Sequence, residues 1–301
     1  LGHDYLVDIE ERYSDTARIT SPTPWDIINE LMQGGLGAGE LGVVVAPAGI
    51  GKSWVLSAMG AYAISQGLNV VHYTLELNEA YVGLRYDSIF TGVESQNLKY
   101  HKEEVMEKLY DLKGSLTIKY YPTKACTVNT LSAHLKKVTT FGTKVDMVLV
   151  DYADIMKDVG KAQEMRHALG NIYEDLRGMA GEMQIPIWTA SQANRSALDE
   201  DVIEASKVAE SYTKVMTADF VISLSRKIED KIGNTGRFHI IKNRFGPDGL
   251  TYPAKINTNI GKIEIFEANS VQGKGVQHKI NNRDNQTKAI LSARYEDLMS
   301  E

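Results

Sequence analysis

The segment that decides the fold of this chain is Ala46-Pro47-Ala48-Gly49-Ile50-Gly51-Lys52-Ser53. It follows an apolar run, Leu41 to Val45, that predicts a buried strand, and it precedes a predicted helix, Trp54 to Gln66, which Gly67 closes. A glycine-rich turn between a strand and a helix directs consecutive backbone N–H groups to one point, where the helix dipole adds positive potential. The segment therefore predicts a loop that holds the phosphates of a nucleoside triphosphate.

Within this loop, Lys52 would reach the β- and γ-phosphates, and the Ser53 hydroxyl would ligate Mg²⁺. The pattern departs from its usual form at Ala46, where glycine is expected, and alanine can serve there if its φ is negative. The alternative is a chance Gly-Lys-Ser at a helix start, but the flanking strand and helix favour a phosphate loop. The residues expected to contact the nucleotide are Ala48, Gly49, Ile50, Gly51, Lys52, Ser53 and Trp54.

The composition excludes several classes of protein. With 301 residues, 43% of them hydrophobic and 24% charged, the chain can bury a large core. A net charge of −6 argues against a surface that is basic throughout, but it leaves room for a local basic groove or channel. The single cysteine, Cys126, excludes an internal disulfide framework and fits a reducing cytosol. No apolar run is long enough to span a membrane, no signal-peptide pattern is present, and a start at Leu1 fits a fragment of a longer protein.

Strand-like and helix-like segments alternate from Leu41 onward, and this order predicts an α/β fold with a mostly parallel twisted sheet and helices on both faces. Two helices are supported by apolar spacing, at Val55, Leu56, Met59 and Ala63, and at Leu131, Leu135 and Val138. Glycine-containing turns join the last strands and predict an antiparallel edge. The expected strands are Leu41–Ala46, Asn69–Leu75, Leu116–Tyr121, Val145–Val150, Ile185–Ala190, Phe220–Ser225, Arg237–Lys242 and Lys262–Phe266.

The ends of the chain differ from this core. We expect an N-terminal arm over residues 1–20, an ATPase domain over 21–268 and a polar tail over 269–301. In the arm, apolar spacing predicts a helix from Asp4 to Asp15, which docks on a neighbouring subunit or packs on its own core. Pro22 and Pro24 end it, and a short helix over Trp25–Met32 follows. Near the other end, residues 289–299 predict another short helix.

A carboxylate, Asp151, follows the apolar run Val145 to Val150. The carboxyl end of a buried parallel strand lies at the sheet edge where ligands bind. Asp151 is therefore the candidate partner of Mg²⁺, together with Ser53. An aspartate that caps a helix N-terminus is the alternative, and the phosphate loop favours the metal.

Two further strand ends carry candidate catalytic groups. Glu76 follows the predicted strand 69–75, at the position where a base could polarise the water that attacks the γ-phosphate. Its alternative is a solvated acid in a turn. Gln192 follows the strand 185–190, where an amide could bind the γ-phosphate or the water and sense its presence. Its alternative is ordinary turn chemistry, since polar residues are common after strands.

Lys242 and Arg244 alternate at the end of the predicted strand 237–242, so both side chains should point to one face. Lys52 already serves the phosphates of this chain. The two cations are therefore expected to reach a nucleotide held by a neighbouring subunit, as an arginine finger does. A solvated edge strand is the alternative, and the spacing alone does not decide between them.

Five motifs in this order resemble the ATPase domain of DnaB-type hexameric replicative helicases, a branch of the RecA-like fold, and the resemblance runs from about Thr23 to Phe266. Ala46 in the first loop position is also usual for that family. The chain departs from the family at Ala153-Asp154, where Leu-Gln is usual. The motifs are the phosphate loop, Leu75-Glu76-Leu77 with Arg85 nine residues on, Asp151-Tyr152, Ser191-Gln192-Ala193-Asn194-Arg195-Ser196, and Lys242-Asn243-Arg244-Phe245-Gly246-Pro247.

The resemblance implies a helicase that hydrolyses ATP with Mg²⁺ at subunit interfaces, translocates on single-stranded DNA and unwinds duplex. It implies Glu76 as base, Gln192 as γ-phosphate sensor, Lys242 and Arg244 as groups acting across the interface, and Arg85 as a residue that orients Glu76 or the phosphate. It also implies a hexameric ring, a primase or loader as a further partner, no membrane association, and a bacterial cytosol or phage-infected host cell. The divergence of the sequence favours a phage origin.

The DNA contacts are expected in loops 157–166 and 195–213, which would face a central channel. The loop 195–218 resembles the family's DNA-binding loop only at Glu210-Ser211 and Ala218-Asp219. Acids are interleaved, so ordinary solvated loops are the alternative. The candidate phosphate contacts are Lys157, Lys161, Arg166, Arg195 and Lys207.

Two other functions fit the same motifs. A RecA-type strand-exchange ATPase would share the loop, base and sheet, but it would form open filaments on DNA instead of closed rings. A nucleotide-gated adaptor or loader would bind ATP and turn over little. Glu76 and the pair Lys242 and Arg244 argue against the second, since a passive switch needs none of them.

Overall fold

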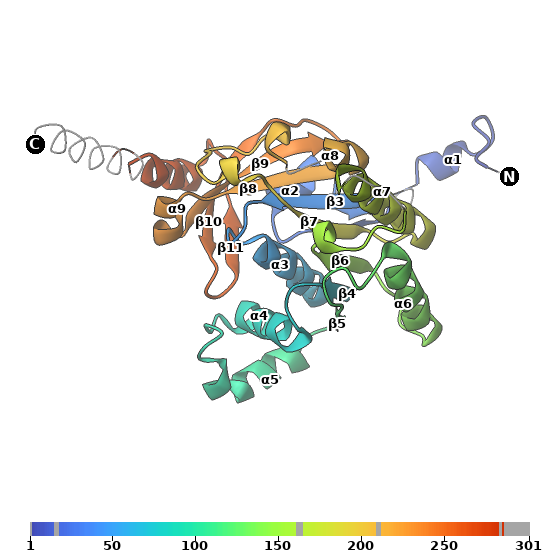
Figure 1. Cartoon of the computed structure of the whole chain (residues 1–301), viewed down its shortest axis with the longest axis horizontal. Helices are drawn as coiled ribbons and strands as arrows, with labels where there is room; N and C mark the ends of the chain where they lie inside the picture. Colours follow the sequence, from blue (N-terminus) through green and yellow to red (C-terminus); the bar gives the residue numbers. More distant parts are fainter. Residues whose placement is uncertain (1, 15–17, 161–164, 209–211, 283–284, 286–301) are drawn as a thin grey trace, which may run out of the picture.

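The computed structural model describes residues 2–14, 18–160, 165–208, 212–282 and 285. Among these residues, a nine-stranded sheet in the order β11-β10-β9-β8-β3-β7-β6-β4-β5 forms the centre of the molecule (Figure 1). A two-stranded sheet of β1 (Thr20–Ser21) and β2 (Leu36–Gly37) lies apart from it. The nine strands are β3 (Leu41–Ala46), β4 (Asn69–Thr74), β5 (Ser115–Tyr120), β6 (Met147–Asp151), β7 (Ile187–Gln192), β8 (Phe220–Ser225), β9 (Thr235–Asn243), β10 (Thr251–Asn257) and β11 (Lys262–Ile265).

Strands β8, β3, β7, β6, β4 and β5 are parallel, whereas β9, β10 and β11 continue the sheet in antiparallel pairs. The predicted mostly parallel sheet with an antiparallel edge is confirmed. Strand β10 was not predicted, although Tyr252, Ala254 and Ile256 alternate in it. Pro253 lies in the middle of this run, and a proline argues against a strand because it lacks the backbone N–H that a ladder needs.

Helices cover both faces of the sheet, as predicted (Figure 1). Helix α3 contacts β3, β4, β6 and β7, and α7 contacts β3 and β7 with α6 and α8 beside it. The helices labelled in Figure 1 are α1 (Ile9–Arg12), α2 (Asp26–Leu31), α3 (Lys52–Ser65), α4 (Glu79–Thr91), α5 (Lys102–Tyr110), α6 (Val128–Thr140), α7 (Met165–Met183), α8 (Tyr212–Thr217) and α9 (Ile228–Gly233).

Strand β3 shows how the sequence produces these two layers. Val43 and Val45 belong to the core that contains the buried residues of α6 and α7, and Val44 and Ala46 belong to the core beneath α3. Alternate side chains of a strand point to opposite faces. Because both faces are covered, the strand reads as a continuous apolar run and not as an alternating one.

The N-terminal arm is less helical than the spacing predicts, since α1 spans only Ile9–Arg12. The carboxylate of Asp4 accepts the N–H groups of Leu6 and Val7, and such local bonds compete with a continuous helix. The four apolar side chains of the predicted stripe are exposed by 48–84%, so in this structure they do not pack on the chain's own core. They are Tyr5, Leu6, Ile9 and Tyr13. Asp15 lies outside the described residues.

At the other end, residues 271–282 form a helix that we did not predict. Val276 and Ile280, four residues apart, are its buried positions. Three apolar residues in this polar stretch, with Val271 exposed, are too few for the periodicity to be recognised. The predicted helix over 289–299 lies outside the described residues. None of the described helices is long and apolar enough to cross a membrane.

Candidate functional site: the phosphate loop and its surroundings

The loop between β3 and α3 has the backbone that the sequence predicts for a phosphate loop. Gly49 and Gly51 have φ values of 71° and 121°, which favour glycine. Helix α3 begins at Lys52, directly after this turn. The positive end of the helix dipole therefore lies at the loop, where it favours an anion.

A cavity of 240 Å³ opens beside this loop. It brings together three of the predicted groups from separate elements, Lys52, Glu76 and Arg85. Glu76 follows β4 and is exposed, whereas Lys52 is buried. The cavity is lined by Gly49, Gly51, Lys52, Ser53, Trp54, Glu76, Leu77, Arg85 and Thr258.

At the edge of this cavity, the Ser53 hydroxyl donates a hydrogen bond of 3.1 Å to Oδ1 of Asp151, the last residue of β6. Asp151 is buried, and burial raises the pKa of its carboxyl group, although the hydrogen bond from Ser53 and the charges of Arg85 and Lys52 oppose the shift. The negative charge of Glu76 adds to it. Two hard oxygen ligands thus lie together where a divalent cation would stabilise the ionised carboxylate.

Arg85 of α4 lies between two predicted groups. Its Nη1 is 4.0 Å from Oδ2 of Asp151, and its guanidinium lies 5.3 Å from the ring centroid of Trp54. Burial lowers the pKa of Arg85, while Asp151 and Glu76 oppose the shift. Within the described chain, this Nη1 is buried without a hydrogen-bond partner. A buried guanidinium N–H without an acceptor is costly, and a phosphate oxygen in the cavity would satisfy it.

Gln192, the predicted sensor, lies next to the loop but not in the lining of this cavity. It pairs with Ala46 across β3 and β7, and its Oε1 accepts a 3.4 Å hydrogen bond from the Tyr152 hydroxyl. The Lys52 ammonium lies 4.4 Å from the ring centroid of the same tyrosine. Tyr152 therefore connects the loop lysine to the predicted sensor.

Lys242 and Arg244 lie at the amino-terminal ends of the parallel strands, whereas the phosphate loop lies at their carboxyl ends. Phe220, at the start of β8, pairs with Gly42 of β3 on one side and with Asn243 of β9 on the other. The end of β9 is therefore level with the beginning of β3, whereas the phosphate loop follows the end of β3. Lys242 donates to the carbonyl of Met216 in α8, and Arg244 contacts the carboxylate of Asp219, which precedes β8. Neither lines the cavity beside the phosphate loop of its own chain.

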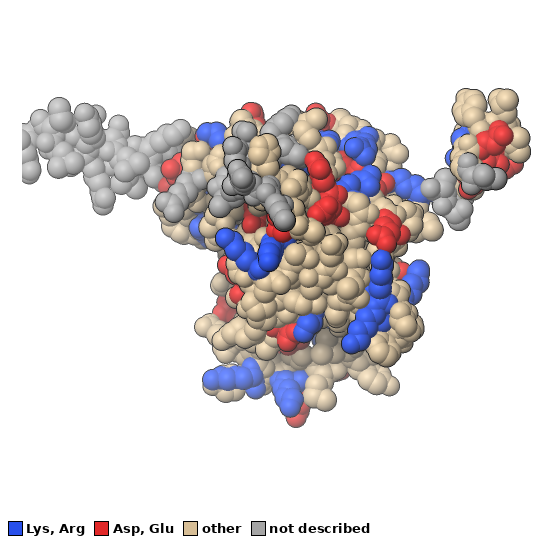
Figure 2. All heavy atoms as spheres, turned by 45° about the vertical axis from the view of Figure 1, so that its right-hand side comes forward, with Lys and Arg blue, Asp and Glu red and all other residues tan. Residues whose placement is uncertain are grey.

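The structure describes only part of the predicted DNA-binding set. Lys157 is exposed, and Lys207 forms an ion pair of 2.8 Å with Glu200, which offsets its charge. Lys161 and the side chains of Arg166 and Arg195 lie outside the described residues. Acidic and basic atoms of the described residues are interspersed on the face that Figure 2 shows, so these residues do not form a patch of one sign there.

Two residues near the loop were not predicted. Arg226 follows β8, the parallel neighbour of β3, and its Nη1 donates a 3.4 Å hydrogen bond to the loop carbonyl of Ile50. Its position after a parallel strand is a signal that could have been used. Thr258 reaches the cavity from the turn between β10 and β11, and nothing in the local sequence indicates this.

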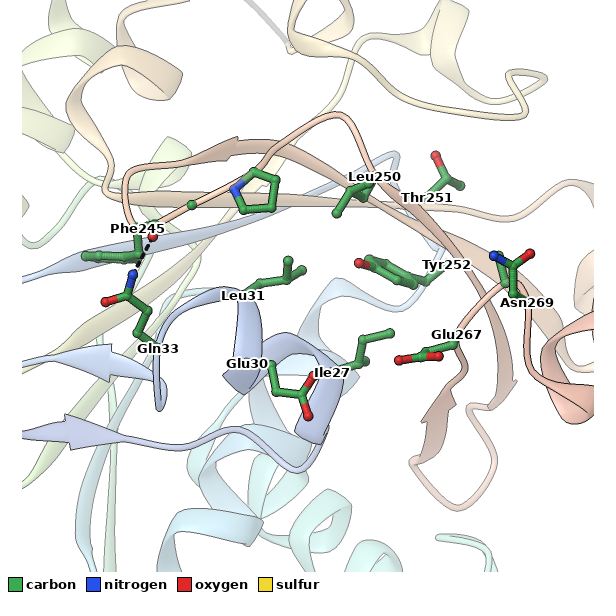
Figure 3. Close-up of a pocket in the computed structure, with 13 residues that line it drawn as sticks. Ile27, Glu30, Leu31, Gln33, Phe245, Leu250, Thr251, Tyr252, Glu267 and Asn269 are labelled. Carbon is green, nitrogen blue, oxygen red and sulfur yellow. Dashed lines mark hydrogen bonds between the residues drawn. The ribbon is translucent and has the colours of Figure 1, made fainter.

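A larger cavity, of 520 Å³, lies between α2, the turn after β9 and residues 267–269 (Figure 3). Its wall is mostly apolar, and Glu30 and Glu267 line it as well. These two carboxylates, after burial, contribute to the raised pKa of Tyr252. A negative, apolar cavity is unsuited to a triphosphate, so the smaller cavity beside Lys52 is the candidate nucleotide site.

Comparison with known proteins shows which family this chain belongs to. Residues 22–260 match the model of the DnaB-like helicase C-terminal domain. A DnaB-like replicative helicase of Enterobacteria phage T4 is 28% identical over 260 residues, which cover 82% of this chain and 55% of that protein. A replicative DNA helicase DnaB of Helicobacter pylori strain 26695 is 24% identical over 172 residues, covering 56% of this chain and 35% of that protein. The chain thus spans about half or less of these relatives.

Solved structures agree on the fold. A separately solved ATPase domain superimposes with a TM-score of 0.73 at 17% identity and covers 87% of this chain and 96% of that one. A DnaB-like replicative helicase, described together with its interactions with primase, gives a TM-score of 0.74 at 17% identity, covering 88% of this chain and 68% of that one. The predicted RecA-like α/β core is therefore confirmed.

Proposed function

Because this chain belongs to the family of DnaB-like helicase C-terminal domains, we propose that it is the motor domain of a replicative DNA helicase. In this proposal it hydrolyses ATP at subunit interfaces, translocates on single-stranded DNA and unwinds duplex. The observation that carries the proposal is the cavity beside the phosphate loop, where Lys52, Ser53, Glu76 and Arg85 converge.

The residues present fit a magnesium-bound triphosphate. Ser53 and Asp151 would hold Mg²⁺, because the Ser53 hydroxyl already lies 3.1 Å from the buried carboxylate of Asp151. The ion would supply charge neutralisation between the β- and γ-phosphates. Lys52 would leave the ring of Tyr152 to bind the phosphates, and the buried Nη1 of Arg85 would donate to a phosphate oxygen.

Hydrolysis would then depend on three further groups. Glu76 would orient and deprotonate the attacking water, since it lines the cavity together with the loop. Gln192 would sense the γ-phosphate through Tyr152, which it contacts. Lys242 and Arg244 would act on the nucleotide of an adjacent subunit, because they lie at the other end of the parallel strands in their own chain.

This arrangement needs an oligomer, and we propose a homohexameric ring. The exposed apolar residues of the N-terminal arm would dock on a neighbouring subunit, since they are unburied within the chain itself. DNA would pass the loops after β6 and β7, with Lys157 among its contacts. A primase or loader would be a further partner.

A strand-displacement assay on forked DNA tests this function. The wild-type chain, in its full-length protein, should unwind the fork with ATP and Mg²⁺, and Glu76→Gln should bind ATP without unwinding. Filaments on single-stranded DNA in electron micrographs, with no unwinding, would favour a RecA-type ATPase instead. Tight ATP binding without DNA-stimulated hydrolysis would favour an adaptor.

A further inference from the structure

Two polar clusters, each built around one carboxylate, lie at the two ends of the parallel strands, and the same helices connect them. We define the sensor cluster as Asp154, Tyr173, Ser191, Lys214 and the backbone N–H of Gln192. The finger cluster consists of Asp219, Arg177, Arg244 and the backbone N–H of Leu41.

In the sensor cluster, the carboxylate of Asp154 accepts four donors. Oδ1 accepts from the Tyr173 hydroxyl at 2.7 Å and from the Lys214 ammonium at 2.9 Å. Oδ2 accepts from the Gln192 backbone N–H at 2.9 Å and from the Ser191 hydroxyl at 3.2 Å. The pairing between β6 and β7 ends at Val150 and Thr189, so the Asp154 carboxylate takes the place of a strand beside Gln192.

Lys214 is the unusual member of this cluster. Its side chain is only 1% exposed, and it also donates to the Ser191 hydroxyl at 3.3 Å and faces the Tyr173 ring at 5.5 Å. A lysine is almost never fully buried unless it is paired. Its partner here, Asp154, holds the backbone of the proposed γ-phosphate sensor.

The finger cluster is held by the carboxylate of Asp219, whose side chain is 1% exposed. It accepts from the Leu41 N–H at 2.9 Å, from Nε of Arg177 at 2.6 Å and from the guanidinium of Arg244. Lys242 donates to the carbonyl of Met216 in α8. The proposed trans-acting cations therefore contact α8 and the residue that precedes β8.

Two parallel connections join the clusters. Helix α8 carries Lys214 in the sensor cluster and leads directly to Asp219 in the finger cluster. On α7, Tyr173 and Arg177 are four residues apart, on one face, and each donates to one of the two carboxylates. Displacement of the Gln192 backbone would pull on both helices through charged hydrogen bonds, which are shorter and stronger than neutral ones.

We propose that Lys214 and Asp154 couple the nucleotide state sensed at Gln192 to the positions of Arg244 and Lys242, which lie at the other end of the parallel strands in the same chain. This coupling rests on the proposed function. Lys214 and Asp154 are positioning residues, since neither touches the nucleotide cavity. Through them, each subunit would present its cations to the neighbour according to the state of its own site.

Hydrogen–deuterium exchange of the full-length protein tests the coupling. Exchange of the amides in residues 212–219 and 242–246 is measured once with ADP and Mg²⁺ bound and once with a non-hydrolysable ATP analogue and Mg²⁺ bound. The two rates are then compared. The wild type should show a difference between the two states of about 5-fold or more. Lys214→Met and Asp154→Asn should bind both nucleotides and lose this difference. Lys144→Met, an exposed lysine paired with Asp146, should keep it.

If Lys214 and Asp154 only stabilise the fold, Lys214→Met and Asp154→Asn should raise exchange in both nucleotide states. The difference in exchange between the two states would then persist. That result overturns the coupling, and so does a wild type without any difference in these segments. If Lys214→Met does not fold, Ser191→Ala removes only the hydroxyl that bonds Asp154 and Lys214, and it should reduce the difference. A wild type that binds neither nucleotide removes the proposed function and the coupling together, whereas normal hydrolysis without a difference removes the coupling alone.

Discussion

The Ser53 hydroxyl and the Asp151 carboxylate are joined by a hydrogen bond of 3.1 Å, although 98 positions separate them along the chain. Each belongs to an element that ends or begins at the same sheet edge, α3 for Ser53 and β6 for Asp151. Their meeting creates the oxygen pair from which the proposed magnesium site follows.

Because burial raises the pKa of Asp151, its carboxyl group stays protonated to a higher pH than a free aspartate. Mg²⁺ needs the ionised form, so binding should release a proton, and Mg²⁺-dependent affinity for ATP should weaken as the pH falls. The stability of the protein without Mg²⁺ should depend on pH in the opposite direction. Ionisation of the buried Asp151 carboxyl group lowers the free energy of unfolding as the pH rises through its raised pKa. Calorimetric titration of ATP at several pH values checks this, with Asp151→Asn expected to bind weakly at every pH. A wild-type affinity that does not change with pH contradicts it.

Glu76→Gln should lower the rate of ATP hydrolysis by about 10²- to 10⁴-fold, because the amide cannot accept the proton of the attacking water. Binding of ATP should be preserved. The matched control is Glu79→Gln, three residues on, whose carboxylate accepts from the Tyr120 N–H and pairs with Lys119 outside the cavity. Its rate should stay near wild type. Equal losses in both variants would argue against a base at position 76.

Arg244→Ala should lower DNA-stimulated hydrolysis by about 10³-fold or more if the guanidinium acts as a finger. The stronger test mixes this variant with Lys52→Ala, which is inactive for a different reason. If Lys52 and Arg244 of neighbouring subunits form one composite site, mixing equal amounts of the two variants should restore about one quarter of the sites. In each restored site, Lys52 comes from one subunit and Arg244 from the next. Unchanged activity of Arg244→Ala alone, or no recovery on mixing, rejects a role across the interface.

Trp54 should report nucleotide binding by its fluorescence. The chain has three tryptophans, and Trp25 and Trp188 are 5% and 0% exposed in the core, whereas Trp54 lines the nucleotide cavity beside Arg85. When Arg85 turns to a phosphate, the cation over the indole ring moves, and the emission should change. A titration with ATP and Mg²⁺ measures it, and Trp54→Phe should abolish the change. A fluorescence change of full size in Trp54→Phe would mean that another tryptophan reports nucleotide binding.

His72 should make the protein sensitive to acid. Burial, with Arg85 nearby, lowers its pKa from 6.5 to about 3, and its Nδ1 hydrogen-bonds to the Tyr86 hydroxyl at 2.8 Å. The unfolded chain binds a proton that the folded chain excludes, so the free energy of unfolding should fall as the pH drops from about 6.5 to about 3. Urea unfolding at several pH values measures the slope, and His72→Gln should flatten it. An equally steep slope in the variant assigns the acid sensitivity to other groups.

Local patterns were enough for the centre of the sheet. The loop between β3 and α3 could be predicted because its glycines, lysine and hydroxyl are contiguous, and Phe220–Ser225 was predicted to the residue. What could not be predicted depends on tertiary contacts. Thr258 reaches the cavity from a distant turn, and the carboxylates of Asp154 and Asp219 gather donors from several elements. The roles assigned to Glu76, Gln192 and Arg244 remain predictions, since their positions are compatible with those roles without testing them.

The reversal of chain direction at β9 has a geometric consequence for assembly. It places Lys242 and Arg244 at the end of the parallel strands opposite the phosphate loop, so the pair does not lie at the loop of its own chain. If the pair serves the nucleotide of a neighbour, a head-to-tail arrangement, in which the cations of each copy meet the loop of the next, would complete every site of a closed ring.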